Sequence, residues 1–186
     1  AESTALMIAH WMRVGFVHGV MNTDNMSIHG LTIDYGPYGW LEDYNPGWTP
    51  NTTDASNRRY RYAQQPQIGA WNLARWLESL IPLMEQPEQL EGVLDHYGEV
   101  FNEHHNRMWV AKLGLGSWVE SDQKLVANLN SALQTIEIDM TIFFRLLSTL
   151  DAPTLDQLSP SFYEPIGVAE QPLNEWLEAW LIRTEG

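Results

Sequence analysis

The stretch 18–36 holds the residue types and the spacing that could bind a metal ion and a phosphate-bearing ligand. Its sequence is HGVMNTDNMSIHGLTIDYG. Asp24 and Asn25 end its first loop, and Asp34 follows a short apolar run. Mg²⁺ prefers oxygen ligands, and at phosphate-binding sites it uses one or two protein groups and keeps several waters. An amide oxygen and a carboxylate that converge from two loops would meet that need.

The order of these residues matches a kinase catalytic loop followed by a metal-binding Asp-[Phe/Tyr]-Gly. In protein kinases, the Asn of the loop and the Asp of this tripeptide hold the metal ions that bridge the nucleotide phosphates. Asn25 and Asp34 fit these two roles. The kinase base lies five residues before the Asn, where this chain has Val20. Because valine accepts no proton, a base in this loop must act from a shifted position, and Asp24 is the nearest carboxylate.

Each short motif alone is common by chance. The alternative interpretation is an Asx turn at Asp24-Asn25 and an Asp34 that merely opens a loop. The joint pattern of His-Gly, Asp-Asn and Ile-Asp-Tyr-Gly around an apolar run favours the metal site. His18 occupies the position of the kinase histidine that braces the loop backbone, so we expect it to give structural support rather than transfer a proton.

Three segments resemble the selenoprotein O family of pseudokinases, also called YdiU proteins. These are HGVMNTDNMSI (18–28), GLTIDYGPYG (30–39) and RYRYAQQPQIGAWNLARW (59–76). The resemblance is specific from about Leu6 to Leu83 and continues more weakly through the remainder. It implies a kinase-like fold in which ATP binds in a flipped orientation and AMP, rather than phosphate, is transferred to Ser, Thr or Tyr hydroxyls of proteins.

The resemblance also implies roles for individual residues. Asp24 matches the proton acceptor, Asn25 and Asp34 match the ligands of Mg²⁺ (or Mn²⁺), and Asp34 also lies against the nucleotide. The family's chains are longer, with a nucleotide-clasping lobe before the matched stretch. Neither G-x-G-x-x-G nor G-x-x-x-x-G-K-[ST] occurs here. We therefore expect this chain to be an internal piece, a carboxyl-side lobe without the N-lobe and inactive alone.

The elements that must position these residues are predicted to be mainly helical. Apolar periodicity predicts a helix over 2–16. Ser27 to Ile33 suggests two short strands turned at Gly30, a small hairpin that would carry the metal site. Stretch 37–66 is too rich in Gly, Pro, Asn and Asp for a long helix. It takes the place of a kinase activation segment, although a surface loop pinned by aromatic residues is the alternative.

Further helices are predicted after this loop. Their ranges are 67–81, 87–112, 122–150 in one or two pieces, and 173–182. The predicted fold class is therefore mainly α, a protein-kinase-like C-lobe with a small β-hairpin, followed by a helical region. We expect residues 1–85 to form the catalytic-loop core, with loop 18–25 and the Asp-Tyr-Gly of 34–36, and residues 86–186 to form a helical extension of the same lobe.

Composition narrows the class of partner. The chain has 10 Lys and Arg against 24 Asp and Glu, a formal net charge of −14, which argues against nucleic acid because phosphate backbones draw clustered cations. Arg58, Arg59 and Arg61 form the only basic cluster. It suits a phosphate, a carboxylate or an acidic peptide, although solvated charges on a strand are an equal alternative.

The remaining features bear on compartment and on a rival metal site. The chain has no cysteine and no apolar run that approaches the roughly 20 residues needed to span a bilayer, and we expect no signal peptide. We expect no membrane partner and a cytoplasmic protein in a bacterium, or a mitochondrial one in a eukaryote. His96, His104 and His105 could suggest a second metal site, but no carboxylate pair completes a known pattern, so we do not favour it.

Two rival functions stay open at this point. The first is a phosphotransferase acting on proteins or on small molecules, as in aminoglycoside kinases, whose loop also begins with His-Gly. Val20 argues against it, since those enzymes carry Asp at that position. The second is a catalytically silent pseudokinase that binds partners through its helical surface. ATP is the expected substrate in either enzymatic case, and the choice of AMP over phosphate rests on the resemblance alone.

Overall fold

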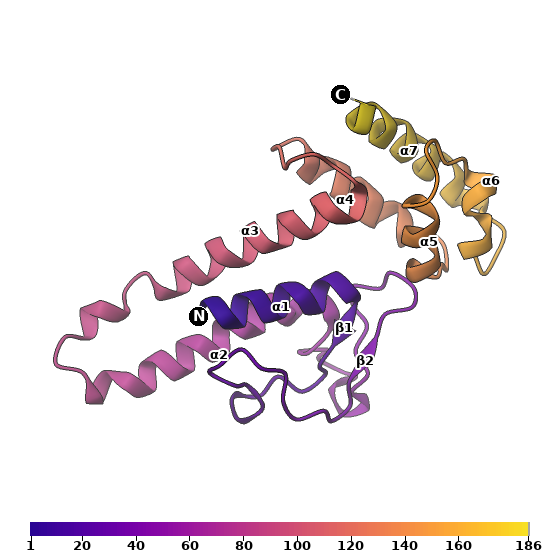
Figure 1. The fold of residues 1–186 in the computed structure, drawn as a ribbon. Helices are drawn as coiled ribbons and strands as arrows, with labels where there is room; N and C mark the ends of the chain where they lie inside the picture. Colours follow the sequence, from indigo (N-terminus) through magenta and orange to yellow (C-terminus); the bar gives the residue numbers. More distant parts are fainter. Residues whose placement is uncertain (186) are drawn as a thin grey trace. The chain divides into compact units, whose positions relative to one another are not determined.

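The computed structural model describes residues 1–185 and is built from helices and one small pair of strands (Figure 1). The longer helices are α1 (Glu2–Val14), α2 (Gln65–Leu80), α3 (Val93–Leu113), α4 (Asp122–Leu133), α5 (Met140–Leu147) and α7 (Glu170–Glu185), and α6 (Leu155–Leu158) is a single turn. The chain divides into two compact units. One contains residues 1–40 and 46–105, and the other contains residues 41–45 and the chain from 106 onward.

Helix α1 contributes buried side chains to the core of the first unit. Its apolar face is buried, and Ala5 and Ile8 have no exposed surface. The helix ends at Gly15, whose left-handed φ of 70° lets its N–H reach back to the carbonyls of Trp11 and Met12. Helix α1 packs on α2, and the approach is close at Gly69, where an added Cβ would lie 2.3 Å from Cδ1 of Ile8. The glycine thus allows the two helices to touch.

The small antiparallel pair of strands exists, but not where the sequence predicted it. Strand β1 (Phe16–Val17) pairs with β2 (Gly39–Trp40), with Phe16 opposite Trp40 and Val17 opposite Gly39. These two strands close the base of a long loop, residues 18–38. The prediction of two strands within 27–33 is wrong, because that segment consists of a turn and irregular backbone.

The wrong prediction has a physical cause. Ile28 and Leu31 are 59% and 61% exposed, so the apolar residues of this segment have no buried face to line, and a strand pattern needs one. The segment attaches to α1 instead. The indole of Trp11 donates to Oγ1 of Thr32 at 2.9 Å, and Gly30 lies so close to Ser3 that an added Cβ would be 2.5 Å from its Cβ.

The helical predictions are confirmed in the main. Helices α2, α4, α5 and α7 fall within or across the predicted ranges, and the range 122–150 forms two pieces. The predicted helix over 87–112 begins later, at Val93, because a short 3₁₀ turn (Pro87–Leu90) precedes it. Stretch 37–66 holds β2, two 3₁₀ turns (Thr52–Asp54 and Tyr62–Gln64) and the first two residues of α2, which begins two residues before its predicted start.

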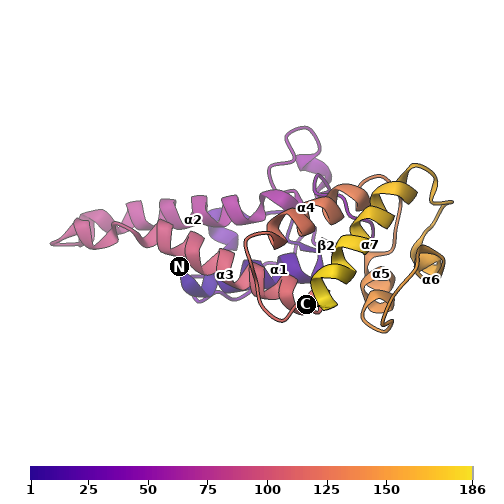
Figure 2. The same ribbon diagram turned by 90° about the horizontal axis from the view of Figure 1, so that it is seen from above.

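The second unit is a helical cluster in which α7 lies alongside α4 (Figures 1 and 2). Its core includes Trp176 and Phe143, which are 1% and 0% exposed. The buried indoles satisfy their N–H groups on backbone carbonyls: Trp176 donates to Leu125 at 3.0 Å and Trp180 to Leu113 at 2.8 Å. These bonds join α7 to the helices on which it packs.

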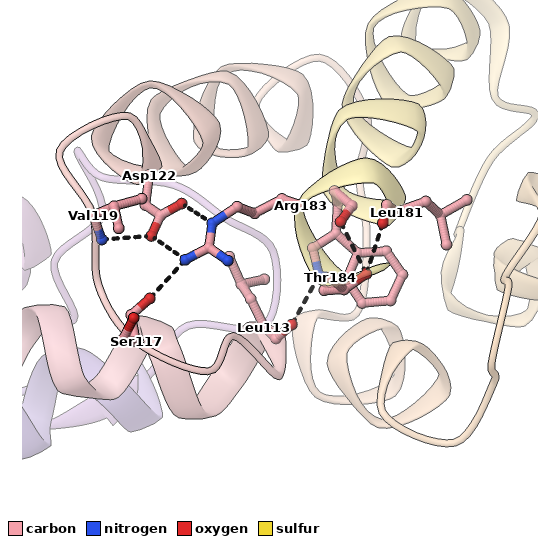
Figure 3. Close-up of polar contacts among 8 residues, drawn as sticks. Leu113, Ser117, Val119, Asp122, Leu181, Arg183 and Thr184 are labelled. Carbon is pink, nitrogen blue, oxygen red and sulfur yellow. Dashed lines mark hydrogen bonds and ion pairs between the residues drawn. The ribbon is translucent and has the colours of Figure 1, made fainter. Parts of the chain in front are cut away.

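One ion pair fastens the last turns of α7 to the start of α4 (Figure 3). Asp122 is 1% exposed. Nε of Arg183 lies 2.8 Å from its Oδ1, and a second guanidinium nitrogen donates to the Ser117 carbonyl at 2.7 Å. Oδ2 of Asp122 accepts from the Val119 N–H at 2.9 Å. A buried carboxylate is tolerated here because each oxygen has a donor.

Candidate functional site

Two amide side chains of α2 hold the backbone that enters the loop. Oε1 of Gln65 accepts from the His18 N–H at 3.0 Å, and its Nε2 donates to the Phe16 carbonyl at 2.9 Å. Two helical turns further along, Nδ2 of Asn72 donates to the Met21 carbonyl at 2.9 Å. Gln65 and Asn72 are 0% and 5% exposed. Buried amides without partners are costly, so these bonds fix residues 16–21 against α2.

The imidazole of His18 connects two segments of the loop. The ring is 1% exposed and stacks on Trp11, with ring centroids 5.5 Å apart. Its Nε2 donates to the Ile33 carbonyl at 2.8 Å, and its Nδ1 accepts from the Val20 N–H at 3.4 Å. These partners select the tautomer with hydrogen on Nε2. The expectation that His18 braces the loop backbone is confirmed.

Asp24 and Asn25 lie in a single 3₁₀ turn, Thr23–Asn25. Nδ2 of Asn25 donates to the Val20 carbonyl at 3.0 Å. This bond uses the amide nitrogen, and within residues 1–185 no protein donor occupies Oδ1. Asp24 is exposed, and no side-chain hydrogen bond or ion pair engages its carboxylate in the described part of the chain. Both groups therefore present oxygens that are not committed to the fold.

Asp34 adopts a left-handed backbone conformation, with φ of 54°. This region is unfavourable for residues with a Cβ and is least so for Asp and Asn. The turn is closed by the Gly36 N–H, which donates to the Asp34 carbonyl at 2.7 Å. The side chain is exposed and has no hydrogen-bonded or ionic partner among residues 1–185. Because the Ile33 carbonyl accepts a hydrogen bond from His18, the position of Asp34 is fixed relative to the loop that carries Asn25.

Aromatic side chains surround this turn. Tyr35 and Tyr38 pack edge to face, with ring centroids 5.3 Å apart, and each also contacts Phe16. Trp40 contacts Phe16 and Tyr38 at 5.5 Å and 5.4 Å. Although Phe16 is buried, Tyr35, Tyr38 and Trp40 are 42–59% exposed. The cluster links the Asp-Tyr-Gly turn to the paired strands.

Asn51 fastens the second loop, 37–66, to the first. Its Nδ2 donates to the Gly19 carbonyl at 3.0 Å, while its Oδ1 accepts from the Thr53 N–H at 3.0 Å and so caps a 3₁₀ turn. Gly19 itself has φ of 79°, and an added Cβ would lie 2.4 Å from the Pro37 carbonyl oxygen. The two loops are thus in contact directly after the Asp-Tyr-Gly turn.

The amides Gln65, Asn72 and Asn51 carry no role in the sequence-based hypothesis. A signal was available for Asn72 alone, because it falls four residues after the apolar Ile68 on one face of the predicted helix 67–81, whereas Gln65 precedes that range. A polar side chain on a buried face must have a partner, but the sequence does not name it. Asn51 gives no such signal, since it lies in a segment without periodicity.

Two of the three histidines of α3, His96 and His105, have partners of other kinds. Nε2 of His96 lies 2.6 Å from Oε1 of Glu2, and this hydrogen bond raises the pKa of the imidazole and lowers the pKa of the carboxyl group. His105 stacks on Phe101. In residues 1–185, no group of three His, Asp or Glu side chains lies close enough to hold a metal ion.

Comparison with known proteins identifies the family. The model of the family described as protein adenylyltransferase SelO matches residues 1–185. A protein nucleotidyltransferase YdiU of Aromatoleum aromaticum is 54% identical over 188 residues, which cover 99% of this chain and 36% of that protein. Proteins of the same name from Rhodopirellula baltica and Flavobacterium johnsoniae are 50% and 48% identical, over 98% and 97% of this chain.

The chain therefore belongs to the SelO family, as the resemblance predicted. It spans little more than a third of the length of the curated relatives it matches. Within the described residues, no helix is both long enough and apolar enough to cross a membrane.

Proposed function

We propose that this chain is the kinase-like C-lobe portion of a protein adenylyltransferase and supplies its catalytic loop and its metal ligands. One observation supports the proposal above all. The Asn25 side-chain amide donates a hydrogen bond to the Val20 carbonyl, and the Val20 N–H donates one to the His18 ring. The same ring donates to the carbonyl of Ile33, the residue before Asp34. This chain of hydrogen bonds sets the two expected metal ligands in a fixed relation, although they are nine residues apart in the sequence.

The residues present suit a divalent ion. Oδ1 of Asn25 and the carboxylate of Asp34 are oxygen donors without protein partners in residues 1–185, and Mg²⁺ or Mn²⁺ binds such groups together with substrate phosphates. A bound ion would neutralise charge on the triphosphate of ATP. Asn25 and Asp34 would hold it, and Asp34 would also lie against the nucleotide. Orienting these oxygens before the ligand arrives is the contribution of this chain.

Asp24 is the proposed proton acceptor. Its carboxylate is exposed beside Asn25, and Val20, at the usual position of the kinase base, offers only an apolar side chain. The oxygen of a Ser, Thr or Tyr hydroxyl on the acceptor protein would attack the α-phosphorus of ATP and form the P–O bond. The bond to the β-phosphate oxygen would break, pyrophosphate would leave, and the hydroxyl proton would pass to Asp24.

The remaining parts of the proposal concern the whole protein. ATP and hydroxyl-bearing proteins are its substrates, and loop 37–66 serves as the activation segment that contacts the acceptor. We retain residues 1–85 as the catalytic-loop core and residues 86–186 as its helical extension. The named relatives come from bacteria, which supports a bacterial source, and we propose the cytoplasm as the compartment. Fractionation of cells that express the tagged parent protein would test the location.

The proposal is tested by incubating the full-length parent protein with Mg²⁺ or Mn²⁺ and either [α-³²P]ATP or [γ-³²P]ATP, followed by counting label on protein. We expect label from the α-phosphate alone, because AMP retains that phosphorus and pyrophosphate carries the other two away. Label from the γ-phosphate alone would instead identify a phosphotransferase. No label from either nucleotide would favour the silent pseudokinase.

A further inference from the structure

The basic loop, residues 54–61, concentrates positive charge on an acidic protein. Arg58, Arg59 and Arg61 occupy three of four consecutive positions, in a chain whose formal net charge is −14. With 24 acidic residues against 10 basic ones, carboxylate partners for these three arginines would be expected. Their actual partners are therefore informative.

No carboxylate in residues 1–185 forms an ion pair with these three guanidinium groups. Arg58 donates to the Gly47 carbonyl at 3.3 Å. Arg61 donates to the Arg58 carbonyl at 3.0 Å and to Oε1 of Gln64 at 2.8 Å. All these acceptors are neutral, so each arginine keeps its full charge and several unused N–H donors, since a guanidinium carries five.

Arg59 is held by an aromatic face. Its guanidinium carbon lies 4.6 Å from the centroid of the Trp71 ring and 5.7 Å from that of Tyr60. The guanidinium carbon of Arg75 also lies over the Trp71 ring, 5.5 Å from its centroid. Stacking uses the flat face of a guanidinium and leaves its edge free for bidentate bonds to a carboxylate or phosphate. Trp71 is 42% exposed and so presents an apolar surface beside the charges.

A carboxylate fixes the shape of the basic loop without neutralising its arginine side chains. Oδ1 of Asp54 accepts from the Arg59 N–H at 2.9 Å, and Oδ2 accepts from the Tyr60 N–H at 2.7 Å. The Asp54 carbonyl accepts from the Arg58 N–H at 2.7 Å. Three consecutive backbone N–H groups thus converge on one residue, which orders the turn that displays the arginines. An ordered site loses less entropy when it binds a ligand.

The basic loop is also tied to the catalytic loop. The hydroxyl of Tyr60 donates a hydrogen bond to Oδ1 of Asn22, two residues before Asp24. An acceptor protein whose hydroxyl reaches Asp24 would therefore pass beside this surface. We propose that Arg58 and Arg59, together with Trp71, bind an acidic segment that flanks the modified hydroxyl of the acceptor protein. This inference rests on the proposed function for the identity of the ligand, but the binding it predicts is measurable without AMP transfer.

The experiment uses the full-length parent protein and two fluorescein-labelled peptides. One peptide has a central Ser and Tyr flanked by Glu residues, and the other has Gln in place of every Glu. Binding is measured by fluorescence anisotropy at low and at high salt. The variant R58Q/R59Q removes two exposed positive charges from the site. The control K124Q/R145Q removes the same charge from α4 and α5, where both side chains are exposed.

We expect the wild-type protein to bind the Glu peptide at least about tenfold more tightly than the Gln peptide, since charge-assisted bonds exceed neutral ones. R58Q/R59Q should weaken binding of the Glu peptide about tenfold, and the control should change it less than twofold. The preference should fall as salt is raised. ATP should not displace the peptide.

Three results would overturn the inference. These are equal binding of the two peptides, an equal effect of the two double variants, or displacement of the Glu peptide by ATP, which would make the arginines a nucleotide site. Transfer of AMP is followed separately with [α-³²P]ATP. Peptide binding that depends on Arg58 and Arg59 without any transfer would contradict the proposed function and leave the binding surface established.

Discussion

The Nε2 of His18 lies 2.8 Å from the carbonyl oxygen of Ile33 and donates a hydrogen bond to it. This single contact crosses the loop from its first residue to the residue before Asp34. Because the opposite ring nitrogen accepts from the Val20 N–H, one buried imidazole sets the spacing between the segment of Asn25 and that of Asp34. A histidine here is a positioning residue for the groups on either side of it.

Replacing His18 should therefore loosen the site as well as the fold. We expect His18→Phe to lower the free energy of unfolding by about 1–3 kcal/mol, because the Val20 N–H and the Ile33 carbonyl each lose the partner of a part-buried hydrogen bond. Urea unfolding of the parent protein, followed by tryptophan fluorescence, measures this. His29→Phe is the control, since His29 is exposed and its ring forms no hydrogen bond or aromatic contact within residues 1–185; it should change stability by less than about 0.5 kcal/mol.

Asp24→Asn should lower kcat for AMP transfer by about 10²–10⁴-fold, the range typical of a lost general base. The KM for ATP should stay within about twofold of wild type, since Asp24 is not a proposed nucleotide contact. Initial rates with [α-³²P]ATP give both constants. Asp151→Asn removes an exposed charge from the second unit and should leave kcat unchanged. Wild-type kcat in Asp24→Asn would exclude Asp24 as the base.

Asp34→Asn should weaken metal binding. We expect the apparent Kd for Mn²⁺ in the presence of a non-hydrolysable ATP analogue to rise at least about tenfold, because the variant replaces an anionic ligand with a neutral one. Electron paramagnetic resonance of free Mn²⁺ measures it without turnover. An unchanged Kd would remove Asp34 from the ligand set. Asp156→Asn, an exposed acid in α6, controls for the loss of general negative charge.

Substitutions at three glycines distinguish the cost of a positive φ from the cost of a steric clash where Gly19 meets Pro37. Gly19 and Gly92 have nearly equal φ values, 79° and 77°, but an added Cβ meets the Pro37 oxygen at 2.4 Å in the first and nothing within 4 Å in the second. Gly116 has neither constraint. We expect Gly92→Ala to cost about 1 kcal/mol through φ alone.

Gly19→Ala should cost about 2–4 kcal/mol, because overpacking adds to the strain, and Gly116→Ala should be neutral. Thermal unfolding of the three variants of the parent protein gives the ranking. Equal effects at Gly19 and Gly92 would show that the two loops are not in contact at Pro37.

The ion pair of Asp122 and Arg183 predicts a dependence of stability on pH. Burial opposes ionisation of Asp122, but hydrogen bonds from Arg183 and from the Val119 N–H, together with the positive charge of Arg183, hold its pKa below the usual value. A carboxyl group with a lowered pKa in the folded state adds stability above its unfolded pKa of about 4, and this stability is lost as pH falls through the folded value.

We therefore expect Arg183→Met to destabilise the protein by about 2–4 kcal/mol at pH 7. The figure is set below that of a fully buried pair because the Arg183 side chain is 26% exposed. The difference from wild type should shrink as pH falls below about 4. Urea unfolding at several pH values measures it. A difference that stays constant down to pH 2 would mean that the ionised carboxylate contributes nothing.

The sequence by itself determined the family, the mainly helical class, and the candidates Asp24, Asn25 and Asp34. It could do so because helices depend on local periodicity, and because the loop motifs keep their order and spacing along the chain. It also indicated that His18 has a supporting role. These are properties of short segments and need no knowledge of which segments meet.

The tertiary structure decided what holds the loop. The amides Gln65, Asn72 and Asn51 bond to backbone groups between Phe16 and Met21, far from them in the sequence. It also placed the paired strands at the base of the loop, and not within 27–33 as predicted. Apolar residues form a strand only where a partner covers one face, and the segment 27–33 contacts α1 instead. Partner choice depends on which surfaces are buried together, and that is set by the packing of α1 on α2 rather than by any local pattern.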